Sequence, residues 1–314
     1  MRPKLGIYLP VYGGWVRGAP LEEADVTYEY AEKVALRAEE IGIDSVWVPD
    51  HLLNPIKGES EKSLEAWTTL AAIAGVTERI ELFHTCLCQG FRYPGVLAKM
   101  CATIADISKG RFRFVLGAGW FEREFHAYGI PWHAHDDRVD RGREQIEIMK
   151  RFWSEARFSY SGRFYEILDG VMEPKPEKMP AVWWAGESER SRILTADLAD
   201  GWLMRGADLQ TVAERILDMR SRLRERGGRS IQYAMPGLML ADETDEKALG
   251  KLKALVRGDP ASVQKSAFVG APETIAAKVR RLGEAGLNYV IFQASPALEL
   301  LEIIDREILP RLRG

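Results

Sequence analysis

The chain has 314 residues, of which 46% are hydrophobic and 28% are charged, and its formal net charge is −3. This composition is typical of a globular protein, and the slight negative charge provides no basic surface for a nucleic acid. Apolar runs fall short of the ~20 residues of a membrane span, and the first residues lack the apolar core of a signal peptide. We therefore expect a cytoplasmic protein without nucleic-acid or membrane partners.

Segments typical of strands and helices alternate along the whole chain. The first pair is an apolar strand at 4–11 and a helix at Asp25–Ile41, in which Tyr30, Val34 and Ala38 recur at helical spacing. Further strands are predicted at 45–51, 80–87, 111–119, 181–186, 201–206, 231–241 and 288–295. The helices that follow them are predicted at Leu64–Ala74, Pro94–Ser108, Arg138–Trp153, Glu189–Ala199, Leu209–Arg226, in a region from Glu243, and at Leu298–Leu312.

Eight such units predict an α/β fold, a single (β/α)8 TIM barrel over residues 1–314, because strands that are apolar on both faces require a parallel sheet covered by helices. An open, doubly wound sheet is the alternative. That fold is expected to carry a G-x-G-x-x-G turn after an early strand, and the sequence has none. Two segments exceed the regular repeat, about 156–180 and 257–270. We predict that they are insertions at the C-terminal mouth, and that the first roofs a substrate pocket.

Polar residues follow most of the predicted strands, at the end of the barrel where (β/α)8 enzymes carry their chemistry. Asp50 and His51 follow the second strand directly. The others are His84, Thr85, Cys86 and Cys88, the segment from Gly117 to Glu122, the segment from Ala185 to Ser191, and Arg205, Gln293 and Ser295. The alternative for Asp50 and His51 is a structural role, as a cap and a satisfied histidine.

The stretch AGESERS at 185–191 is the best candidate for an anion site. Gly186 lets a ligand approach the backbone, and Ser188 can cap a helix that begins near Glu189. The free N–H groups of that first turn suit a phosphate, and Arg190 and Ser191 could add a charge and a hydroxyl. The alternative is an ordinary capped helix.

Other chemistries have little support in the sequence. The stretch HAHDD at 133–137 suggests metal ligands, but the first strand offers neither histidine nor acid to converge with them, so no metal is expected. There is no G-x-S-x-G nucleophile turn. We expect Cys86, Cys88 and Cys101 to be reduced, buried thiols.

Six phrases in order along the chain resemble the bacterial luciferase-like superfamily of flavin- and deazaflavin-dependent oxidoreductases. They are SVWVPDH, LEAWTTLAAIAGVTERIEL, FRYPGVLAKMCATIADISKGRFRFVLGAGWFEREFHAYGIP, RGREQIEIMKRFW, FVGAPETIAAKV and AGLNYVIFQASPALELLEIIDREILPRL. The resemblance implies the same barrel, a flavin or deazaflavin held across the C-terminal mouth, and a homodimer.

The resemblance also assigns residues. It implies that Asp50 and His51 lie beside the ring, that Thr85–Cys86 forms a bulge with a cis non-prolyl bond, and that Cys88 packs near the ring. The turn at 185–191 corresponds to a loop used against the cofactor tail or phosphate. The predicted cofactor-binding residues are Asp50, His51, Thr85, Cys86, Cys88, Gly119, Trp120, Ala185, Gly186, Glu187, Ser188 and Ser191.

Three functions are compatible with this resemblance, and we expect the first, with F420 as the cofactor; the other two are alternatives. The first is hydride transfer between coenzyme F420 and a small organic substrate, with His51 and Glu122 as acid and base, although Pro55 stands where related sugar-phosphate dehydrogenases have a tryptophan. The second is a two-component, FMNH2-dependent monooxygenase of the alkanesulfonate or sulfone type, supplied by a separate reductase. The third is a flavin-binding relative without catalysis. Asp50 would set the tautomer of His51 or bind the ring, and an aromatic substrate pocket would include Trp120, Trp183, Trp184 and Trp202.

Overall fold

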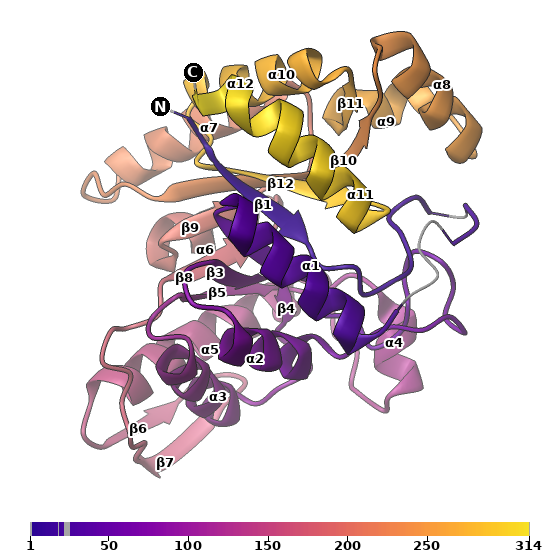
Figure 1. Cartoon of the computed structure of the whole chain (residues 1–314). Helices are drawn as coiled ribbons and strands as arrows, with labels where there is room; N and C mark the ends of the chain where they lie inside the picture. The colour runs from indigo at the N-terminus through magenta and orange to yellow at the C-terminus, as the bar shows by residue number, and fades with distance from the viewer. Residues whose placement is uncertain (1, 18, 22–25, 314) are drawn as a thin grey trace.

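The computed structural model describes residues 2–17, 19–21 and 26–313 (Figure 1). Within this part of the chain, eight parallel strands close into a barrel, because the last strand pairs with the first. In order around the barrel they are β1 (Lys4–Tyr8), β2 (Ser45–Val48), β3 (Glu81–His84), β5 (Phe112–Gly117), β8 (Val182–Ala185), β9 (Gly201–Leu203), β10 (Gln232–Ala241) and β12 (Tyr289–Ala294). The predicted (β/α)8 barrel is confirmed.

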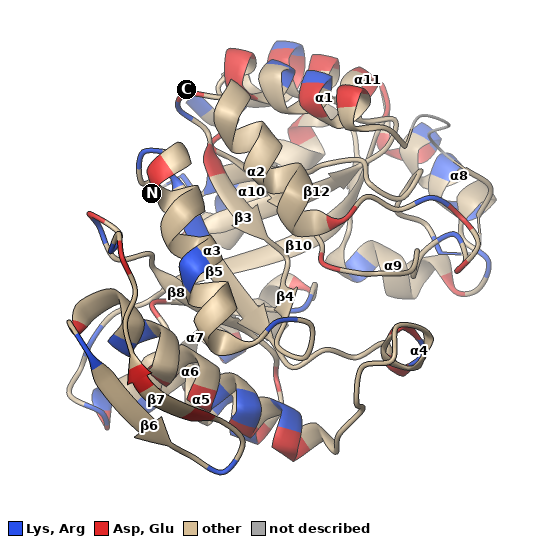
Figure 2. Ribbon diagram, turned by 90° about the horizontal axis from the view of Figure 1, so that it is seen from below, with Lys and Arg blue, Asp and Glu red and all other residues tan. Residues whose placement is uncertain are grey.

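Helices surround the barrel and carry charged residues of both signs (Figure 2). Those of the outer ring are α1 (Tyr28–Ile41), α2 (Ala66–Val76), α3 (Pro94–Ile107), α5 (His135–Ser154), α6 (Glu189–Leu198), α7 (Leu209–Arg224), α10 (Pro272–Glu284), and the C-terminal run of α11 (Ala297–Ile303), the π-helical turn η1 (Ile304–Ile308) and α12 (Leu309–Arg313). The predicted start of the first helix, Asp25, lies outside the described residues. No helix in the described ranges has the length and apolar character needed to cross a bilayer.

The chain leaves the regular repeat after β10. The predicted helix from Glu243 exists as α8 (Asp245–Leu255), but it belongs to an excursion with α9 (Pro260–Ser266) and β11 (Phe268–Gly270), which pairs with β10. The helix that packs between its neighbours in the outer ring is α10, against α7 and η1. Its buried face, with Ile275 and Val279, follows helical spacing, which is the signal that would have located it in the sequence.

The first of the two long segments lies outside the mouth of the barrel. Residues 156–180 contain an antiparallel pair, β6 (Phe158–Ser161) and β7 (Glu166–Gly170), which lies against α5, where Phe158 packs edge-on against Phe152 at 4.7 Å between ring centroids. In Figure 1 this pair sits at the outer edge of the helical layer, away from α9 and α4 (Glu122–Ala127). It contributes no residue to the mouth cavity described below, so it does not roof that cavity.

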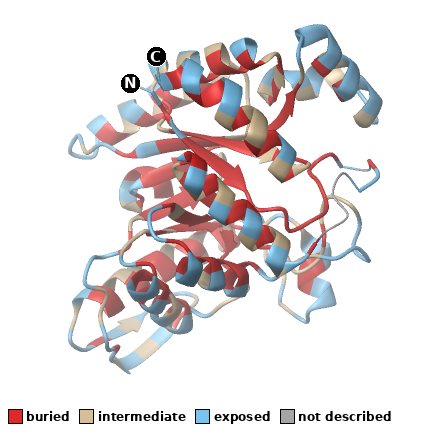
Figure 3. Cartoon of the chain, viewed as in Figure 1, coloured by how far each residue is buried: buried red, intermediate tan, exposed pale blue. Residues whose placement is uncertain are grey.

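The barrel interior is filled by large aromatic side chains rather than left open, and Figure 3 shows most of the barrel strands as buried. Trp47 stacks on Phe83 with ring centroids 3.8 Å apart, and Trp183 packs edge-on against Tyr289. Gly201 leaves room for this layer, because a Cβ there would lie 2.1 Å from the Trp183 ring. These contacts fill the interior of the barrel.

Three of the four tryptophans expected in a substrate pocket are therefore core residues. Trp183, Trp184 and Trp202 are fully buried. Successive residues of a strand point to opposite faces, so Trp183 enters the barrel while Trp184 packs outward against Gly142 of α5. Only Trp120 stands at the mouth.

His84 at the end of β3 is also a core residue, and it provides a test of the packing. It is fully buried, and its ring stacks on Trp67 with centroids 5.0 Å apart. Burial lowers the pKa of His84 from 6.5 to about 4. The folded protein thus resists protonation that the unfolded chain accepts, so the contribution of His84 to stability is lost as pH falls from about 6.5 towards 4.

We predict that His84→Phe, which keeps an aromatic ring beside Trp67, makes unfolding less sensitive to acid. The free energy of unfolding of the variant minus that of the wild type should be about 2 kcal/mol larger at pH 4.5 than at pH 7.5. Urea unfolding of both proteins at the two pH values measures this difference. A difference that is the same at both pH values would contradict the buried, neutral histidine.

Candidate active site

The C-terminal ends of the strands surround a cavity of about 590 Å³. Segments that follow β2, β3, β5, β8 and β9 contribute to its wall. The wall includes every predicted cofactor-binding residue except Ser188: Asp50, His51, Thr85, Cys86, Cys88, Gly119, Trp120, Ala185, Gly186, Glu187 and Ser191. Residues scattered over more than a hundred positions of sequence thus meet at one site.

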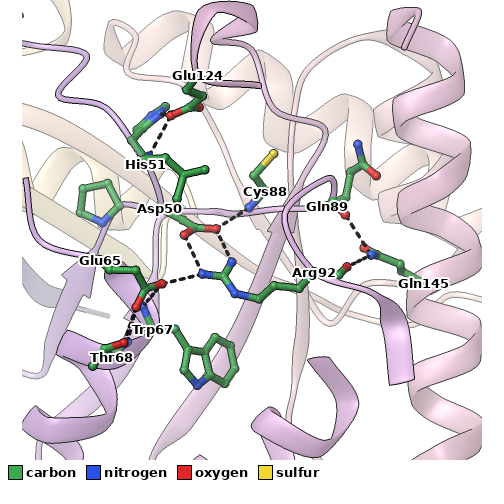
Figure 4. A network of polar contacts seen from close by, with 12 residues as sticks. Asp50, His51, Glu65, Trp67, Thr68, Cys88, Gln89, Arg92, Glu124 and Gln145 are labelled. Carbon is green, nitrogen blue, oxygen red and sulfur yellow. Dashed lines mark hydrogen bonds and ion pairs between the residues drawn. The ribbon is translucent and has the colours of Figure 1, made fainter. Parts of the chain in front are cut away.

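Asp50 is held by a buried ion pair at the edge of this cavity (Figure 4). Arg92 donates to both carboxylate oxygens, with Nη1 2.7 Å from Oδ2 and Nη2 3.1 Å from Oδ1. The N–H of Cys88 donates to Oδ2 as well, at 2.9 Å. These donors occupy the carboxylate, so Asp50 is not the residue that sets the tautomer of His51.

Arg92 extends the contact into the helical layer. Its Nη2 donates to Glu65 at 2.7 Å, and Glu65 caps α2 by accepting from two N–H groups of the first turn. Burial raises the pKa of Glu65, but hydrogen bonds from Thr68 and Trp67 and the charge of Arg92 outweigh it and lower that pKa. From α5, Gln145 Nε2 donates to the carbonyl of Arg92 at 2.7 Å. The ion pair therefore joins α2 and α5 to the end of β2.

His51 has a different carboxylate partner, Glu124. The Nδ1 atom of His51 lies 3.0 and 3.1 Å from the two carboxylate oxygens, and one of them also accepts the N–H of Leu52 at 2.9 Å. Because a carboxylate accepts hydrogen bonds, Nδ1 carries the proton and Nε2 is left as the basic nitrogen. The His51 ring meets Trp120 edge-on, with centroids 5.4 Å apart.

The structure places Glu124 in the position that the sequence assigned to Glu122. Both residues lie in α4, and residues two positions apart in a helix stand roughly 200° apart around its axis. Glu122 consequently faces solvent, with a side chain 54% exposed and no described polar contact closer than His126 at 3.9 Å, while Glu124 is 1% exposed. No helix was predicted over this segment from the sequence. The spacing of Phe121, Glu124 and Phe125 was the available signal for an inward helical face.

The bulge after β3 forms one wall of the cavity. The Thr85–Cys86 peptide bond is cis, as the family resemblance implied. Burial and the charge of Asp50 raise the pKa of the Cys86 thiol to about 12, and burial raises that of Cys88 well above its ordinary value. Both side chains are therefore thiols at neutral pH and serve as packing groups.

The turn between β8 and α6 forms another part of the wall and has the features of an anion site. Ser188 caps the helix by accepting the N–H of Ser191 at 3.2 Å, and the other N–H groups of the first turn have no partner within the helix. Glu187 lies beside them, but Arg215 pairs with its carboxylate at 2.7 Å. Arg190 does not add charge to the cavity, because it pairs with Asp140 of α5.

Six wall residues were not expected at the mouth from the sequence: Glu124, His135, Arg138, Leu203, Met204 and Pro236. Arg138 is, with Glu124, one of the two buried charged residues among them. Its guanidinium lies 3.7 Å from the centre of the Trp132 ring and donates to the carbonyl of His133. Within residues 2–17, 19–21 and 26–313, no cluster of histidine, cysteine, aspartate or glutamate could hold a metal ion.

The sequence model of the luciferase-like monooxygenase family matches residues 11–262. The chain belongs to the luciferase-like monooxygenase family. This match confirms the resemblance seen in the sequence, and the family consists of flavin- and deazaflavin-dependent oxidoreductases. The chain is similar to the FMNH2-dependent dimethylsulfone monooxygenase of Pseudomonas putida, with 25% identity across 99% of this chain and 95% of the relative. It is also 28% identical to a pyrimidine monooxygenase of Allorhizobium ampelinum, across 87% of this chain and 77% of the relative.

Solved structures of this family share the fold. A long-chain alkane monooxygenase superposes with a TM-score of 0.84 at 17% identity, covering 100% of this chain and 91% of that one. An F420-dependent secondary alcohol dehydrogenase superposes with a TM-score of 0.81 at 21% identity, covering 100% of both chains. Identities this low establish the common barrel alone.

We predict that Asp50→Asn destabilises the protein by about 2–4 kcal/mol, because it leaves the buried charge of Arg92 with Glu65 as its remaining partner. The exposed Asp106→Asn in α3 is the matched control and should change stability by less than ~0.5 kcal/mol. Urea unfolding measures both. The double variant Asp50→Asn, Arg92→Met should regain part of the loss. An unchanged stability in Asp50→Asn together with weaker flavin binding would instead assign Asp50 to the cofactor.

The two glutamates of α4 provide a second paired test. Glu124→Ala should lower the free energy of unfolding by about 1–3 kcal/mol, because the ring N–H of His51 and the backbone N–H of Leu52 lose a buried acceptor. Glu122→Ala, in the first turn of the same helix, should change it by less than ~0.5 kcal/mol. Equal effects in denaturant unfolding would contradict the inward position of Glu124.

Proposed function

We propose that the chain is a monooxygenase that uses reduced FMN, bound across the C-terminal mouth, to oxygenate a small organic substrate. The observation that carries the proposal is that the same cavity is lined by a turn suited to a phosphate and by the His51–Glu124 pair. A relationship to an FMNH2-dependent monooxygenase across 99% of the chain supports it.

The residues present fit a flavin. The cavity volume lies within the range of about 300–1,000 Å³ that is usual for small-molecule sites. Two wall glycines have positive φ, Gly119 at 80° and Gly186 at 147°. A Cβ at Gly119 would lie 2.7 Å from the Cys88 sulfur, and one at Gly186 would lie 2.7 Å from Ser191 Oγ. Glycine at both places thus allows the close packing of the wall itself. The turn at 185–191 would hold the phosphate, and the bulge at Thr85–Cys86 would support the ring.

A bound reduced flavin would supply the electrons with which dioxygen is activated. The contribution of this chain is proton transfer and exclusion of water. Glu124 holds the protonated Nδ1 of His51 and stabilises the imidazolium that forms when Nε2 takes a proton. Apolar wall residues such as Leu203, Met204 and Pro236 limit access of water to the reacting groups.

Hydride transfer with coenzyme F420 is the second candidate. The same His51–Glu124 pair favours it, because removal of a hydride from an alcohol requires a base for the hydroxyl proton. The pair serves either chemistry, so the cofactor separates the two candidates. A flavin-binding relative without catalysis is not proposed, because this cavity carries the ionisable side chains of His51, Glu124 and Arg138 where a purely binding mouth needs only apolar ones.

We further propose that the protein works in the cytoplasm as a homodimer and receives reduced FMN from a separate reductase. The sequence supports the reductase, because it lacks a G-x-G-x-x-G turn for a nicotinamide cofactor.

Titration of flavin fluorescence tests the proposed cofactor. We expect tighter binding of FMN than of coenzyme F420, and tighter binding of FMN than of riboflavin, because the β8–α6 turn binds the phosphate. Gly186→Ala should weaken FMN binding at least about tenfold. The matched control is Gly58→Ala, since Gly58 also has a positive φ, of 131°, but an added Cβ there meets no atom within 4 Å. Tight binding of F420 without measurable binding of FMN would favour the hydride transferase.

A further inference from the structure

A second cavity, of about 690 Å³, adjoins the first, and both are lined by Arg205 and Pro236. Its wall comes from the segment after β1, from β10, and from the excursion that includes α9. The segment 257–270, predicted as an insertion at the mouth, thus contributes Arg257, Val263 and Ser266. We refer to this second cavity as the arginine lobe.

The arginine lobe is cationic. Arg17, Arg205 and Arg257 line it, and its described wall contains no aspartate or glutamate. This differs from the outer helices, where charges of both signs are intermixed (Figure 2). A cavity with three guanidinium groups and no acid on its described wall has a positive potential that attracts anions.

The three guanidinium groups have no hydrogen bond or ion pair with any described residue. The backbone of Arg205 is fixed, because its N–H donates to Glu187 and its carbonyl accepts from Arg215, but its side chain is not engaged. Arg17 lies over the Trp120 ring at 5.4 Å, which keeps it beside the first cavity. Elsewhere, Arg37 pairs with three carboxylates and Arg222 with two. Arg37 and Arg222 are thus held by carboxylates, whereas no described residue pairs with the guanidinium groups of the lobe.

The rest of the lobe wall is neutral and largely apolar. It includes Trp15, Val16, Leu238, Val256 and Val263, with Gln293 as a neutral polar group. Arginine binds planar or tetrahedral oxyacids through paired N–H groups, and apolar walls favour an organic body. The lobe therefore suits an organic anion better than an inorganic one.

We propose that the arginine lobe binds the acid group of the substrate, so that the substrates are organic carboxylates or sulfonates whose reacting atom lies in the first cavity. This proposal rests on the proposed function, which places the flavin in the first cavity. A flavin phosphate or the acidic tail of F420 has the same chemistry as a substrate acid. No residue of the phosphate-suited turn at 185–191 lines the lobe, however, so the lobe is assigned to the substrate.

Two probes of similar shape and different charge test the lobe, benzenesulfonate and the neutral methyl phenyl sulfone. Calorimetric titration of the purified protein, with and without saturating FMN, should show benzenesulfonate binding at least about tenfold more tightly than the sulfone. Arg205→Gln and Arg257→Gln should each weaken sulfonate binding about fivefold or more and change sulfone binding less than about twofold. Arg224→Gln, an exposed arginine at the end of α7 and outside the lobe, is the matched control and should change neither.

Three results would overturn the proposal. They are equal binding of the two probes, an equal loss of sulfonate binding in Arg224→Gln, and unchanged sulfonate binding in both lobe variants. A cofactor arm tests the source of the anion: FMN and riboflavin are titrated into the same variants, and F420 alongside them. Weaker binding of FMN or F420 in the lobe variants, with riboflavin binding unchanged, would assign the arginines to the cofactor and overturn the assignment to the substrate.

The proposed function fails separately. A protein that binds neither FMN nor F420 contradicts the proposed function, whereas its selective binding of benzenesulfonate through Arg205 and Arg257 would still support an anion site. A protein that binds FMN but does not distinguish the two probes retains the proposed function and loses the substrate class.

Discussion

The buried ion pair between Asp50 and Arg92 is the contact on which the architecture of the mouth depends. A charge removed from water is costly unless it is paired and hydrogen-bonded. This pair meets that condition because Arg92 also donates to Glu65, the residue that caps α2, and Asp50 also accepts the N–H of Cys88. Because Asp50 directly precedes His51, the pair fixes the backbone from which His51 extends. Proton chemistry at the mouth is thus anchored in the helical layer.

The fold could be predicted from the sequence because a closed parallel barrel leaves a strong local signal. Each strand is buried on both faces, so it appears as a short apolar run such as Val182–Ala185, and the residue that follows it lies at the mouth. The wrong expectations concern the direction in which side chains at or near a strand end point. Whether Trp184 faces a pocket or a helix depends on Gly142 of α5, which no local pattern reveals.

Within the candidate site, positions were predictable and partners were not. Asp50 and His51 could be placed at the mouth by their strand. Their partners, Arg92 and Glu124, come from positions 42 and 73 residues further along the chain, and tertiary packing alone brings them together. The spacing of Phe121, Glu124 and Phe125 is a short signal, because α4 has only six residues, yet that helix decides which glutamate faces inward.

The pairing of charges at the mouth differs between carboxylates and arginines. Each described carboxylate on the first cavity wall has a partner: Asp50 has Arg92, Glu187 has Arg215, and Glu124 has His51 and the Leu52 N–H. Arg138 there and the three arginines of the lobe have no carboxylate partner among the described residues. Among the described residues, arginines therefore outnumber carboxylates on the walls of the two cavities, although the net charge of the whole chain is −3. Low-dielectric walls concentrate the field of these arginines, so anionic ligands are drawn to the site while the acidic remainder of the surface repels them.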